Sequence, residues 1–321
     1  MRDAMTNGFN AIIGSQAAPQ LAIVGSGDWT KAALDVCPPE LPSVVVSTPN
    51  EADLSSVRIL LGAPAELIHF IPSCPNLQWV QSTWAGVDAI ANFATEQLQI
   101  TALKGVFGQA MSEFVIGWLL AIERQIIQRG VATTWLDGPD GTVAGKTLGI
   151  MGTGSIGSAI AGASCTFKLR CRGLNSDGRT QEGFDSCFAT NDRLAFARGL
   201  DYLVSVLPNT PQTDELVDAA LLDQLSPGAI FINVGRGNAV DERALVAALA
   251  SGQLRSAVLD VFNTEPLPPD HVFWRTKNLH ITAHTAAPTP SDAILSVFAE
   301  NLHRFLQNKP LLYGVCSQKG Y

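Results

Sequence analysis

Short apolar runs recur along the chain between proline- and glycine-containing turns, which is the pattern of buried strands that alternate with helices. In the first third of the chain, helix-like stretches at 30–36 and 64–70 lie between some of these runs. The runs predict strands at residues 21–26, 43–48, 58–63 and 77–83. Strands that alternate with helices in this way predict a first β/α domain.

The second part of the chain continues this alternation with longer elements. Residues 111–129 predict one long helix, which Gly130 closes. Helical patterns at 221–225 and 242–251 fill gaps between further apolar runs. These runs predict strands at residues 148–151, 169–174, 202–207, 229–234, 256–262 and 279–282. Because short strands alternate with helices here, we expect a parallel, doubly wound sheet.

A glycine-rich turn stands near the middle of the chain, where residues 148–162 read LGIMGTGSIGSAIAG. This is the G-x-G-x-x-G pattern between an apolar strand and a helix, the context in which it binds a dinucleotide. Gly152 permits the tight turn, Gly154 lets the backbone approach a pyrophosphate, and Gly157 lets the helix pack on its strand. The helix N-terminus adds a partial positive charge for the phosphates. The turn residues expected to bind the dinucleotide are Gly152, Gly154, Ser155, Ile156 and Gly157.

The position of this turn predicts two domains of one architecture. We expect a dinucleotide-binding domain over residues 105–288, and a substrate-binding (catalytic) domain over residues 1–104 plus 289–321. A last helix is predicted at 291–307, with its first residue, Ser291, as the N-cap. The predicted fold class is α/β, with two Rossmann-like, doubly wound parallel-sheet domains and the active site in the cleft between them.

Composition excludes several classes of protein. The 321 residues are 46% hydrophobic and 16% charged, which is typical of a folded protein and not of a disordered one. The net charge is −8 without a basic cluster, so nucleic acid is not an expected partner. No apolar run reaches the roughly 18 residues of a membrane span, and the N-terminal stretch lacks the features of a signal peptide. We therefore expect a cytoplasmic protein without a membrane partner, whose residues 1 to about 18 form a loose arm.

The cysteines show no sign of a disulfide framework or a metal site. They form no C-x-x-C pair and lack the partner spacing of metal ligands, so we predict no metal site. We expect them to be small buried residues in a reducing compartment. The six cysteines are Cys37, Cys74, Cys165, Cys171, Cys187 and Cys316.

Three residues with functional side chains follow strand candidates beyond the glycine turn. Arg236 follows AIFINV, Glu265 follows SAVLDVFNT, and His284 follows LHITA. In a parallel sheet the carboxyl ends of the strands line the ligand crevice, so we expect these three side chains to lie there. Arginine binds a carboxylate through two parallel hydrogen bonds, histidine exchanges a proton near neutral pH, and a neighbouring glutamate orients the ring. A 2-keto acid needs all three functions, although each residue alone is more typical of a salt bridge or a loop.

The sequence resembles the NAD(P)-dependent D-2-hydroxyacid dehydrogenase family from about Asn76 to the C-terminus, whereas residues 1–75 match it only in outline. The segments WVQSTWAGVD and GVFGQAMSEFV, with the closing KGY, look closest to the glyoxylate/hydroxypyruvate reductase branch. The blocks that carry the resemblance are WVQSTWAGVDAI, GKTLGIMGTGSIGSAIA, LPNTPQT, FINVGRGNAVDERALVAAL, LDVFNTEPLP and HITAHTAAPT.

The resemblance implies a role for each matching residue. Arg236 would bind the substrate carboxylate, His284 would be the acid/base, and Glu265 would be its partner. Asp260 would meet the nicotinamide amide. Backbone N–H groups at Ala85, Gly86 and Val87 would bind the substrate. Trp84 would either shape the pocket or serve as a core or hinge residue. Further residues along the coenzyme would be Leu207, Pro208, Thr213, Val234 and Gly235.

The resemblance also implies an oligomeric state and a coenzyme. Relatives are usually homodimers, so we expect a homodimer with the helix at 111–129 at its interface. NAD-preferring members usually have an aspartate after the strand at 169–174, whereas this chain has Asn175, which does not repel a 2′-phosphate. Ser176 and Arg179 could bind that phosphate, although Asp177 opposes it. We therefore expect NADP as the preferred coenzyme, with NAD as the alternative.

The expected function is NAD(P)H-dependent reduction of a small 2-keto acid, of the glyoxylate or hydroxypyruvate type, to the D-2-hydroxy acid. Another dehydrogenase of the family, of the D-lactate type, is an alternative. A nucleotide-sensing, corepressor-like binding protein is a second alternative, because fold alone does not decide function. The presence of Glu265 disfavours a formate dehydrogenase, since that branch pairs its histidine with glutamine.

Overall fold

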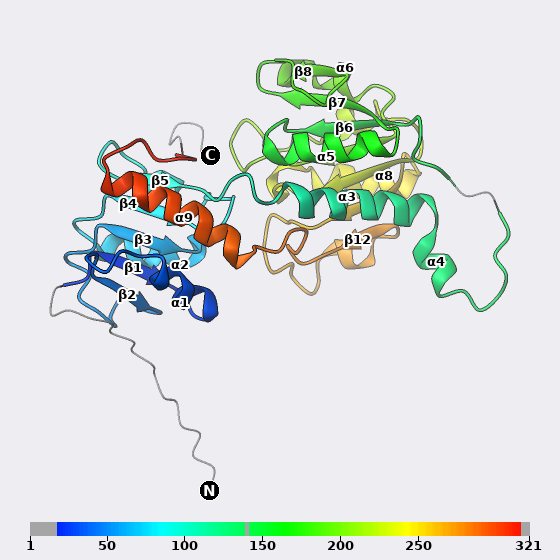
Figure 1. Ribbon diagram of the computed structural model, residues 1–321. Coiled ribbons are helices and arrows are strands. Elements are labelled where there is room, and N and C mark those ends of the chain that lie inside the picture. The colour runs from blue at the N-terminus through cyan, green and yellow to red at the C-terminus, as the bar shows by residue number, and fades with distance from the viewer. Residues whose placement is uncertain (1–17, 139–140, 316–321) are drawn as a thin grey trace, which may run out of the picture. The chain divides into compact units, whose positions relative to one another are not determined.

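The computed structural model describes residues 18–138 and 141–315 of the chain (Figure 1). Residues 1–17 of the predicted arm, Cys316 and the closing KGY lie outside the described residues. The described chain forms two compact units. One comprises the described residues up to Lys104 and from Thr289 onward, and the other comprises those from Gly105 to Pro288.

The first unit is built on a five-stranded parallel sheet with the strand order β2-β1-β3-β4-β5. Its strands are β1 (Leu21–Val24), β2 (Ser43–Val46), β3 (Ile59–Gly62), β4 (Trp79–Ser82) and β5 (Gln99–Thr101). Its helices are α1 (Asp28–Asp35), α2 (Pro64–Phe70) and α9 (Ser291–Leu306), with short 3-10 turns η1 (Ile71–Ser73) and η2 (Ala91–Phe93). Every residue of β1, β3 and β4 is buried; β1 and β3 are therefore apolar runs in the sequence, whereas β4 also buries Gln81 and Ser82.

The C-terminal helix α9 packs on the sheet of the first unit (Figure 1). The ring of Trp79 on β4 stacks on the rings of Phe298 and Phe305, with centroids 5.8 and 5.4 Å apart. The buried Asn301 donates from Nδ2 to Gln81 Oε1 at 3.0 Å. These contacts place the last helix of the chain in the unit that the first hundred residues form.

The second unit is built on a seven-stranded parallel sheet with the order β12-β11-β10-β9-β6-β7-β8. Its strands are β6 (Thr147–Met151), β7 (Arg170–Asn175), β8 (Ser186–Ala189), β9 (Tyr202–Ser205), β10 (Ala229–Asn233), β11 (Leu254–Leu259) and β12 (Leu279–Ile281). Its helices are α3 (Gly108–Glu123), α4 (Ile126–Gly130), α5 (Ser155–Thr166), α6 (Arg193–Ala197), α7 (Ala219–Leu222) and α8 (Glu242–Ser251), with 3-10 turns η3 (Thr190–Asp192), η4 (Gly237–Ala239) and η5 (Val272–Arg275).

Helices cover both faces of this sheet. Leu119 of α3 and Ile160 of α5 pack in one apolar cluster with strand residues of β6 and β9. Leu221 of α7 and Leu245 of α8 pack in a second cluster, with the alternate residues of the strands. The two clusters confirm the predicted doubly wound, parallel-sheet architecture.

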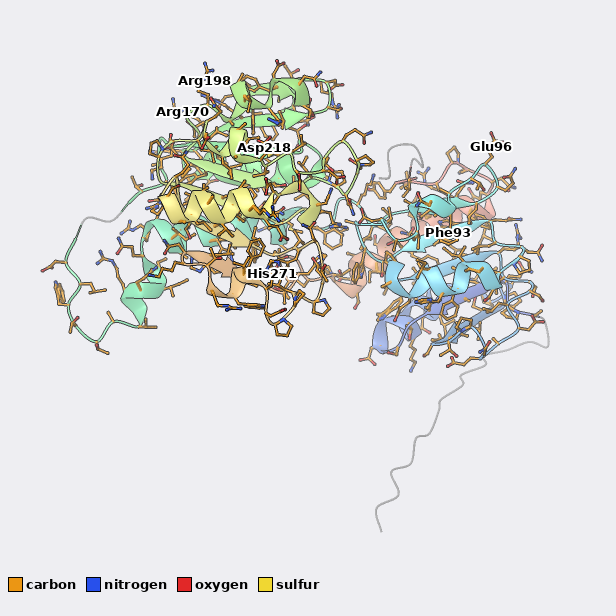
Figure 2. The ribbon with its side chains drawn as sticks, turned by 180° about the vertical axis from the view of Figure 1, so that it is seen from behind. Phe93, Glu96, Arg170, Arg198, Asp218 and His271 are labelled. Atoms are coloured by element: carbon orange, nitrogen blue, oxygen red, sulfur yellow. The ribbon has the colours of Figure 1, made fainter. Side chains whose placement is uncertain are left out.

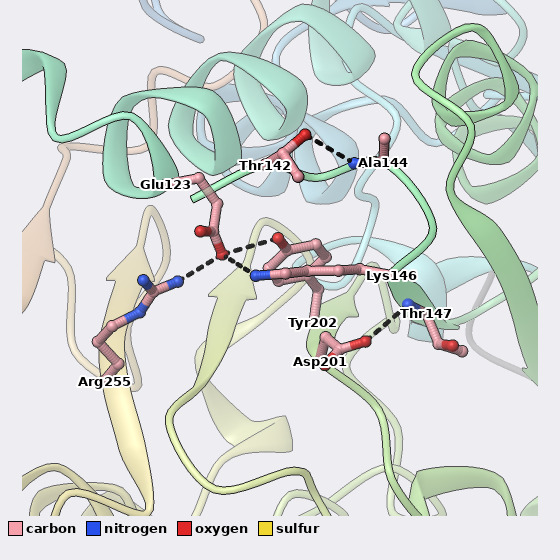
Figure 3. A network of polar contacts seen from close by, with 8 residues as sticks. All are labelled: Glu123, Thr142, Ala144, Lys146, Thr147, Asp201, Tyr202 and Arg255. Atoms are coloured by element: carbon pink, nitrogen blue, oxygen red, sulfur yellow. Dashed lines mark hydrogen bonds and ion pairs between the residues drawn. The ribbon is translucent and has the colours of Figure 1, made fainter. Parts of the chain in front are cut away.

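The single helix predicted at 111–129 is wrong, because the chain forms α3 and then the separate short helix α4. Gln125, between them, has a left-handed backbone with φ of 53°. The last residue of α3 is Glu123, which is 1% exposed and accepts hydrogen bonds from Lys146, Tyr202 and Arg255 (Figure 3). These contacts hold the end of α3 against the sheet, and the chain turns away immediately after it.

Two other local predictions need correction. Ser291 is the first residue of α9 and not its N-cap, because Pro290 has the extended backbone that precedes the first turn. Cys165 is exposed and Cys37 and Cys187 are half-buried, whereas Cys74 and Cys171 are buried as expected. Among the residues that the structure describes, no helix combines the length and apolar character that crossing a membrane requires.

Candidate active site

Three neighbouring strands of the second unit end beside one another and carry the predicted catalytic residues. The loops after β10, β11 and β12 contain Arg236, Glu265 and His284 respectively. The Asp260 N–H donates to the Asn233 carbonyl at 3.0 Å, and the His284 N–H donates to the Asp260 carbonyl at 2.8 Å. The parallel register therefore continues past the strands and brings the three loops to one edge of the sheet, as the sequence predicted.

Glu265 and His284 form a direct pair at this edge. His284 Nδ1 lies 2.8 Å from Glu265 Oε2, and the two side chains are 40% and 35% exposed. The other carboxylate oxygen, Oε1, accepts the Phe262 N–H at 2.9 Å. Because the backbone holds one oxygen, the carboxylate presents the second to the imidazole in a fixed direction. Such a carboxylate favours the imidazole tautomer that carries a proton on Nδ1.

The loop that carries Glu265 is anchored to the start of α8. Glu242 Oε1 accepts a hydrogen bond from Asn263 Nδ2 at 3.1 Å, and Glu242 Oε2 lies 3.2 Å from His271 Nε2. Asn263 precedes Glu265 and His271 follows it (Figure 2 labels His271). The Glu242 side chain therefore holds the loop on both sides of Glu265.

Asp260 organises the loop that carries His284. It is 1% exposed, and its Oδ1 accepts bonds from Thr282 Oγ1 at 2.5 Å and the Thr285 N–H at 2.8 Å. Its Oδ2 accepts the Ala286 N–H at 3.0 Å. These bonds surround His284, whose φ of 53° is left-handed and needs such support. The contact of Asp260 with a nicotinamide amide stays a prediction.

Arg236 is half-buried in the loop after β10. Its Nη1 donates to the Gly235 carbonyl at 2.8 Å. An added Cβ at Gly235 would lie 2.6 Å from the Leu207 backbone, and one at Gly237 would lie 2.0 Å from the Phe262 carbonyl carbon. The two glycines let the arginine loop pass between its neighbours at distances that no other residue permits.

The glycine turn has the geometry that a dinucleotide needs. Gly152 has a φ of 101°, and an added Cβ at Gly157 would lie 1.9 Å from the Gly152 carbonyl oxygen. The position of a Cβ at Gly154 has no atom within 4 Å, so the space above the start of α5 is open. No side chain of the described residues caps the first turn of α5. Open space at the free helix N-terminus fits a pyrophosphate.

Asn175, at the end of β7, holds the following loop together. It is 9% exposed, and its Nδ2 donates to Thr153 Oγ1 at 3.1 Å and to the Arg179 carbonyl at 2.9 Å. Its Oδ1 accepts the Gly178 N–H at 2.7 Å. Arg179 Nη1 pairs with Asp177 Oδ1 at 2.9 Å on the exposed tip, beside the exposed Ser176. The amide of Asn175 is thus engaged within the protein, and its predicted contact with the ribose stays a prediction.

The other predicted coenzyme contacts lie near the ends of β9 and β10. Leu207 and Val234 are buried there, and the Val234 N–H donates to the Ser205 carbonyl at 3.0 Å. Thr213 Oγ1 donates to the Pro208 carbonyl at 2.7 Å and closes the turn after β9. These residues form the same edge of the sheet as the glycine turn.

The segment predicted to bind the substrate, residues 84–87, lies in the first unit, directly after β4. The Trp84 N–H donates to Ser82 Oγ at 2.9 Å, and the Trp84 carbonyl accepts the Leu103 N–H at 2.9 Å. The Trp84 side chain is 43% exposed, whereas Val87 is buried. Ala85 and Gly86 lie between them, half-buried. The carboxylate contacts of this segment stay predictions.

Sequence reasoning missed three residues that support the site. Thr153 links the glycine turn to Asn175, and Thr282 bonds to Asp260. Asn233 lies fully buried between β10 and the arginine loop. Asn233 carried a signal, since it is a polar residue inside the apolar run AIFINV. The two threonines carried none, because their partners are 22 residues away in the chain.

The doubly wound sheet has a glycine turn, and Arg236, Glu265 and His284 lie in loops at one edge, which is the arrangement that the sequence predicted for a dinucleotide-dependent enzyme. Residues 117–286 match the NAD binding domain of the D-isomer specific 2-hydroxyacid dehydrogenases. The chain belongs to this family. It is 33% identical over 244 residues to glyoxylate/hydroxypyruvate reductase A of Serratia proteamaculans, covering 71% of this chain and 76% of the relative.

Solved structures of relatives agree with this family. A D-isomer specific 2-hydroxyacid dehydrogenase family protein of Aeromonas salmonicida is 34% identical, with a TM-score of 0.85 over 94% of this chain and 100% of the other. The NADPH-dependent glyoxylate/hydroxypyruvate reductase of Sinorhizobium meliloti, determined with NADP and sulfate, is 29% identical, with a TM-score of 0.83 over 95% of this chain and 100% of the other.

Proposed function

We propose that this protein reduces a small 2-keto acid, of the glyoxylate or hydroxypyruvate type, to the D-2-hydroxy acid with NAD(P)H. The observation that carries the proposal is the 2.8 Å contact between His284 and Glu265 beside the Arg236 loop. A relative with a matching fold is an NADPH-dependent glyoxylate/hydroxypyruvate reductase, which supports the same substrate class. We assign coenzyme binding to the unit of residues 105–288 and substrate binding to the other unit.

In the proposed mechanism, Arg236 and His284 each act on one part of the substrate, and Glu265 supports His284. Arg236 binds the carboxylate with its planar fork, and the N–H groups of Ala85, Gly86 and Val87 assist. When bound, the coenzyme supplies the hydride that adds to the carbonyl carbon. His284 gives a proton from Nε2 to the carbonyl oxygen, which becomes the hydroxyl group. Glu265 stabilises the imidazolium and holds the ring through Nδ1.

We propose NADP as the preferred coenzyme. The end of β7 carries no carboxylate that would repel a 2′-phosphate, because Asn175 stands there. The exposed Ser176 and Arg179 can reach a phosphate at the loop tip, where Arg179 would exchange Asp177 for the ligand. Since that ion pair is exposed, breaking it costs little free energy, and the Asp177 carboxylate that remains beside the phosphate opposes the exchange.

The test is a matrix of initial rates. Purified protein is assayed with NADPH and NADH against glyoxylate, hydroxypyruvate, pyruvate and phenylpyruvate. We expect the highest kcat/KM with NADPH and one of the first two acids, and a loss of about 10² to 10⁴ in kcat for His284→Asn. The matched control is His303→Asn on α9 in the first unit, which should keep full activity.

Three results would contradict parts of this proposal. A preference for pyruvate would favour the D-lactate type. Tight coenzyme binding without turnover on any acid would favour a nucleotide-sensing binding protein. Full activity of His284→Asn would refute the mechanism.

We also propose a homodimer in the cytoplasm. The helix α4 and the segment after it extend away from the sheet of the second unit (Figure 1). They expose large apolar side chains: Ile126 55%, Ile127 46%, Val131 76%, Trp135 89% and Leu136 43%. Large apolar side chains that are exposed this close together in the chain are typical of a surface that a protein partner covers. The five described cysteines are free thiols, which supports a reducing compartment.

A further inference from the structure

Asn233 is a buried polar side chain to which the proposed mechanism gives no task. It ends β10 and is 0% exposed. Its Oδ1 accepts the Gly235 N–H at 3.1 Å, and its Nδ2 donates to the Arg236 carbonyl at 2.9 Å. A single amide group therefore binds the backbone on both sides of the peptide bond that joins Gly235 to Arg236.

This arrangement reaches the guanidinium group through one further bond. Arg236 Nη1 donates to the Gly235 carbonyl at 2.8 Å. That carbonyl belongs to the peptide bond between the two groups that Asn233 holds. If the flanking groups are fixed, the direction of the carbonyl is fixed, and the carbonyl then holds one nitrogen of the guanidinium in place.

The surroundings leave the loop little freedom to compensate for a change at Asn233. The backbone at Gly235 lies against Leu207, and the backbone at Gly237 lies against Phe262. A shift toward either neighbour is therefore blocked by backbone atoms. Phe262 also donates its N–H to Glu265, so a shift on that side would disturb the His284 pair as well.

We propose that Asn233 is a positioning residue that aims the Arg236 guanidinium at the substrate carboxylate. The inference rests on the proposed function, since it takes Arg236 as the carboxylate ligand. Asn233 touches neither substrate nor coenzyme in this proposal. Its contribution is to the affinity for the carboxylate, and the proton and hydride steps do not depend on it directly.

The test replaces Asn233 by leucine, which is similar in size and removes both hydrogen bonds. We expect KM for glyoxylate to rise at least tenfold, kcat at saturation to stay within threefold, and the dissociation constant of NADPH, measured by fluorescence, to stay within twofold. Calorimetric binding of oxalate to the protein saturated with NADP should weaken at least tenfold. Asn233→Ser, which keeps one of the two bonds, should give intermediate values. It takes the place of the leucine variant in these measurements if the leucine variant does not fold.

The matched control is Ile232→Val, at the preceding, fully buried position of the same strand. A purely structural role for Asn233 would lower the folded fraction and the apparent kcat, and KM of the remaining enzyme would not move. Folded Asn233 variants with KM and oxalate affinity within twofold of wild type overturn the inference, as does an equal KM rise in Ile232→Val. Oxalate binding needs no turnover, so wild-type protein that binds oxalate but reduces no 2-keto acid contradicts the proposed reaction alone. Wild-type protein that neither binds oxalate nor reduces any 2-keto acid overturns both.

Discussion

Replacing Glu123 by glutamine should destabilise the second unit, and the loss should depend on pH. The Glu123 carboxylate is 1% exposed, and its Oε1 accepts bonds from Lys146 Nζ at 2.7 Å, Tyr202 OH at 2.7 Å and Arg255 Nη2 at 2.5 Å (Figure 3). Glutamine keeps an acceptor oxygen at this place but removes the charge. The three bonds would therefore lose the extra strength that an ionised acceptor gives them.

The magnitude follows from the exposure of the three partners. Lys146 and Arg255 are 32% and 44% exposed, so hydrogen bonds to water replace much of their weakened interaction with residue 123. Together these two partners account for about 1 kcal/mol of lost unfolding free energy. Tyr202 is buried, and weakening its bond from charged to neutral strength costs about 1–2 kcal/mol. The sum is about 2–3 kcal/mol, which corresponds to a Tm about 4–12 °C lower for a unit of this size.

The pH dependence has a definite sign. Burial raises the pKa of Glu123, but the bonds from Lys146, Tyr202 and Arg255 and the charge of Arg255 outweigh burial and lower the pKa below its ordinary value of 4.5. A carboxyl with a lowered pKa in the folded state stabilises the fold above its unfolded pKa, and this stabilisation is lost as the pH falls through the folded pKa. The difference between wild type and Glu123→Gln should therefore be constant near neutral pH and shrink below about pH 4.5.

Urea unfolding followed by circular dichroism at several pH values measures this difference. The control is Glu300→Gln on α9, where the carboxylate is 49% exposed and pairs with Arg304 four residues later. Exposed pairs of this kind contribute about 0.5 kcal/mol or less. The reasoning is refuted if Glu123→Gln costs no more than the control, or if its cost is the same at neutral pH and in acid.

Three further predictions concern the coenzyme, the partner surface and the thiols. Arg179→Gln should raise the dissociation constant of NADPH about fivefold, which is the effect of losing an exposed charged contact, and leave that of NADH unchanged. Asn175→Asp should shift the coenzyme preference toward NADH. Fluorescence titrations that give an unchanged ratio of the two dissociation constants would contradict both expectations. Trp135→Ser removes the proposed central anchor of the interface and should raise the dissociation constant of the dimer at least about 30-fold. Light scattering at micromolar concentrations would detect this change. Burial, with smaller contributions from Cys165 and Asp185, raises the pKa of the Cys171 thiol to about 12, so iodoacetamide at pH 8 should label the exposed Cys165 and spare Cys171, as peptide mass spectrometry would show.

Much of the fold was predictable because its signals are local. Strands β1 and β3 are buried over their whole length and contain no polar side chain, so each is an apolar run in the sequence. The short β5 and β8 were not predicted, since β5 begins with an exposed residue and β8 has no buried residue. Strands of this kind are held by their neighbours in the sheet, and a sequence pattern of three or four residues does not show this.

Part of the site was predictable, because some of its residues directly follow strands that are apolar runs in the sequence. Arg236 and His284 follow apolar runs, and the parallel sheet then brings them to one edge. The break after α3 was not predictable, because the contacts of Glu123 come from residues as far as 132 positions away. Asn175 illustrates the same limit, since its identity was plain in the sequence but its bonds to Thr153 and Arg179 were not.

The contacts described above for Glu265 and His284, the proposed catalytic pair, lie within one unit. Glu265 is held by the Phe262 N–H, and its loop is held by Glu242 on both sides. His284 is held by the bonds that its loop makes to Asp260. All of these contacts lie between Asn233 and Ala286, so the acid/base geometry is set where the coenzyme is proposed to bind.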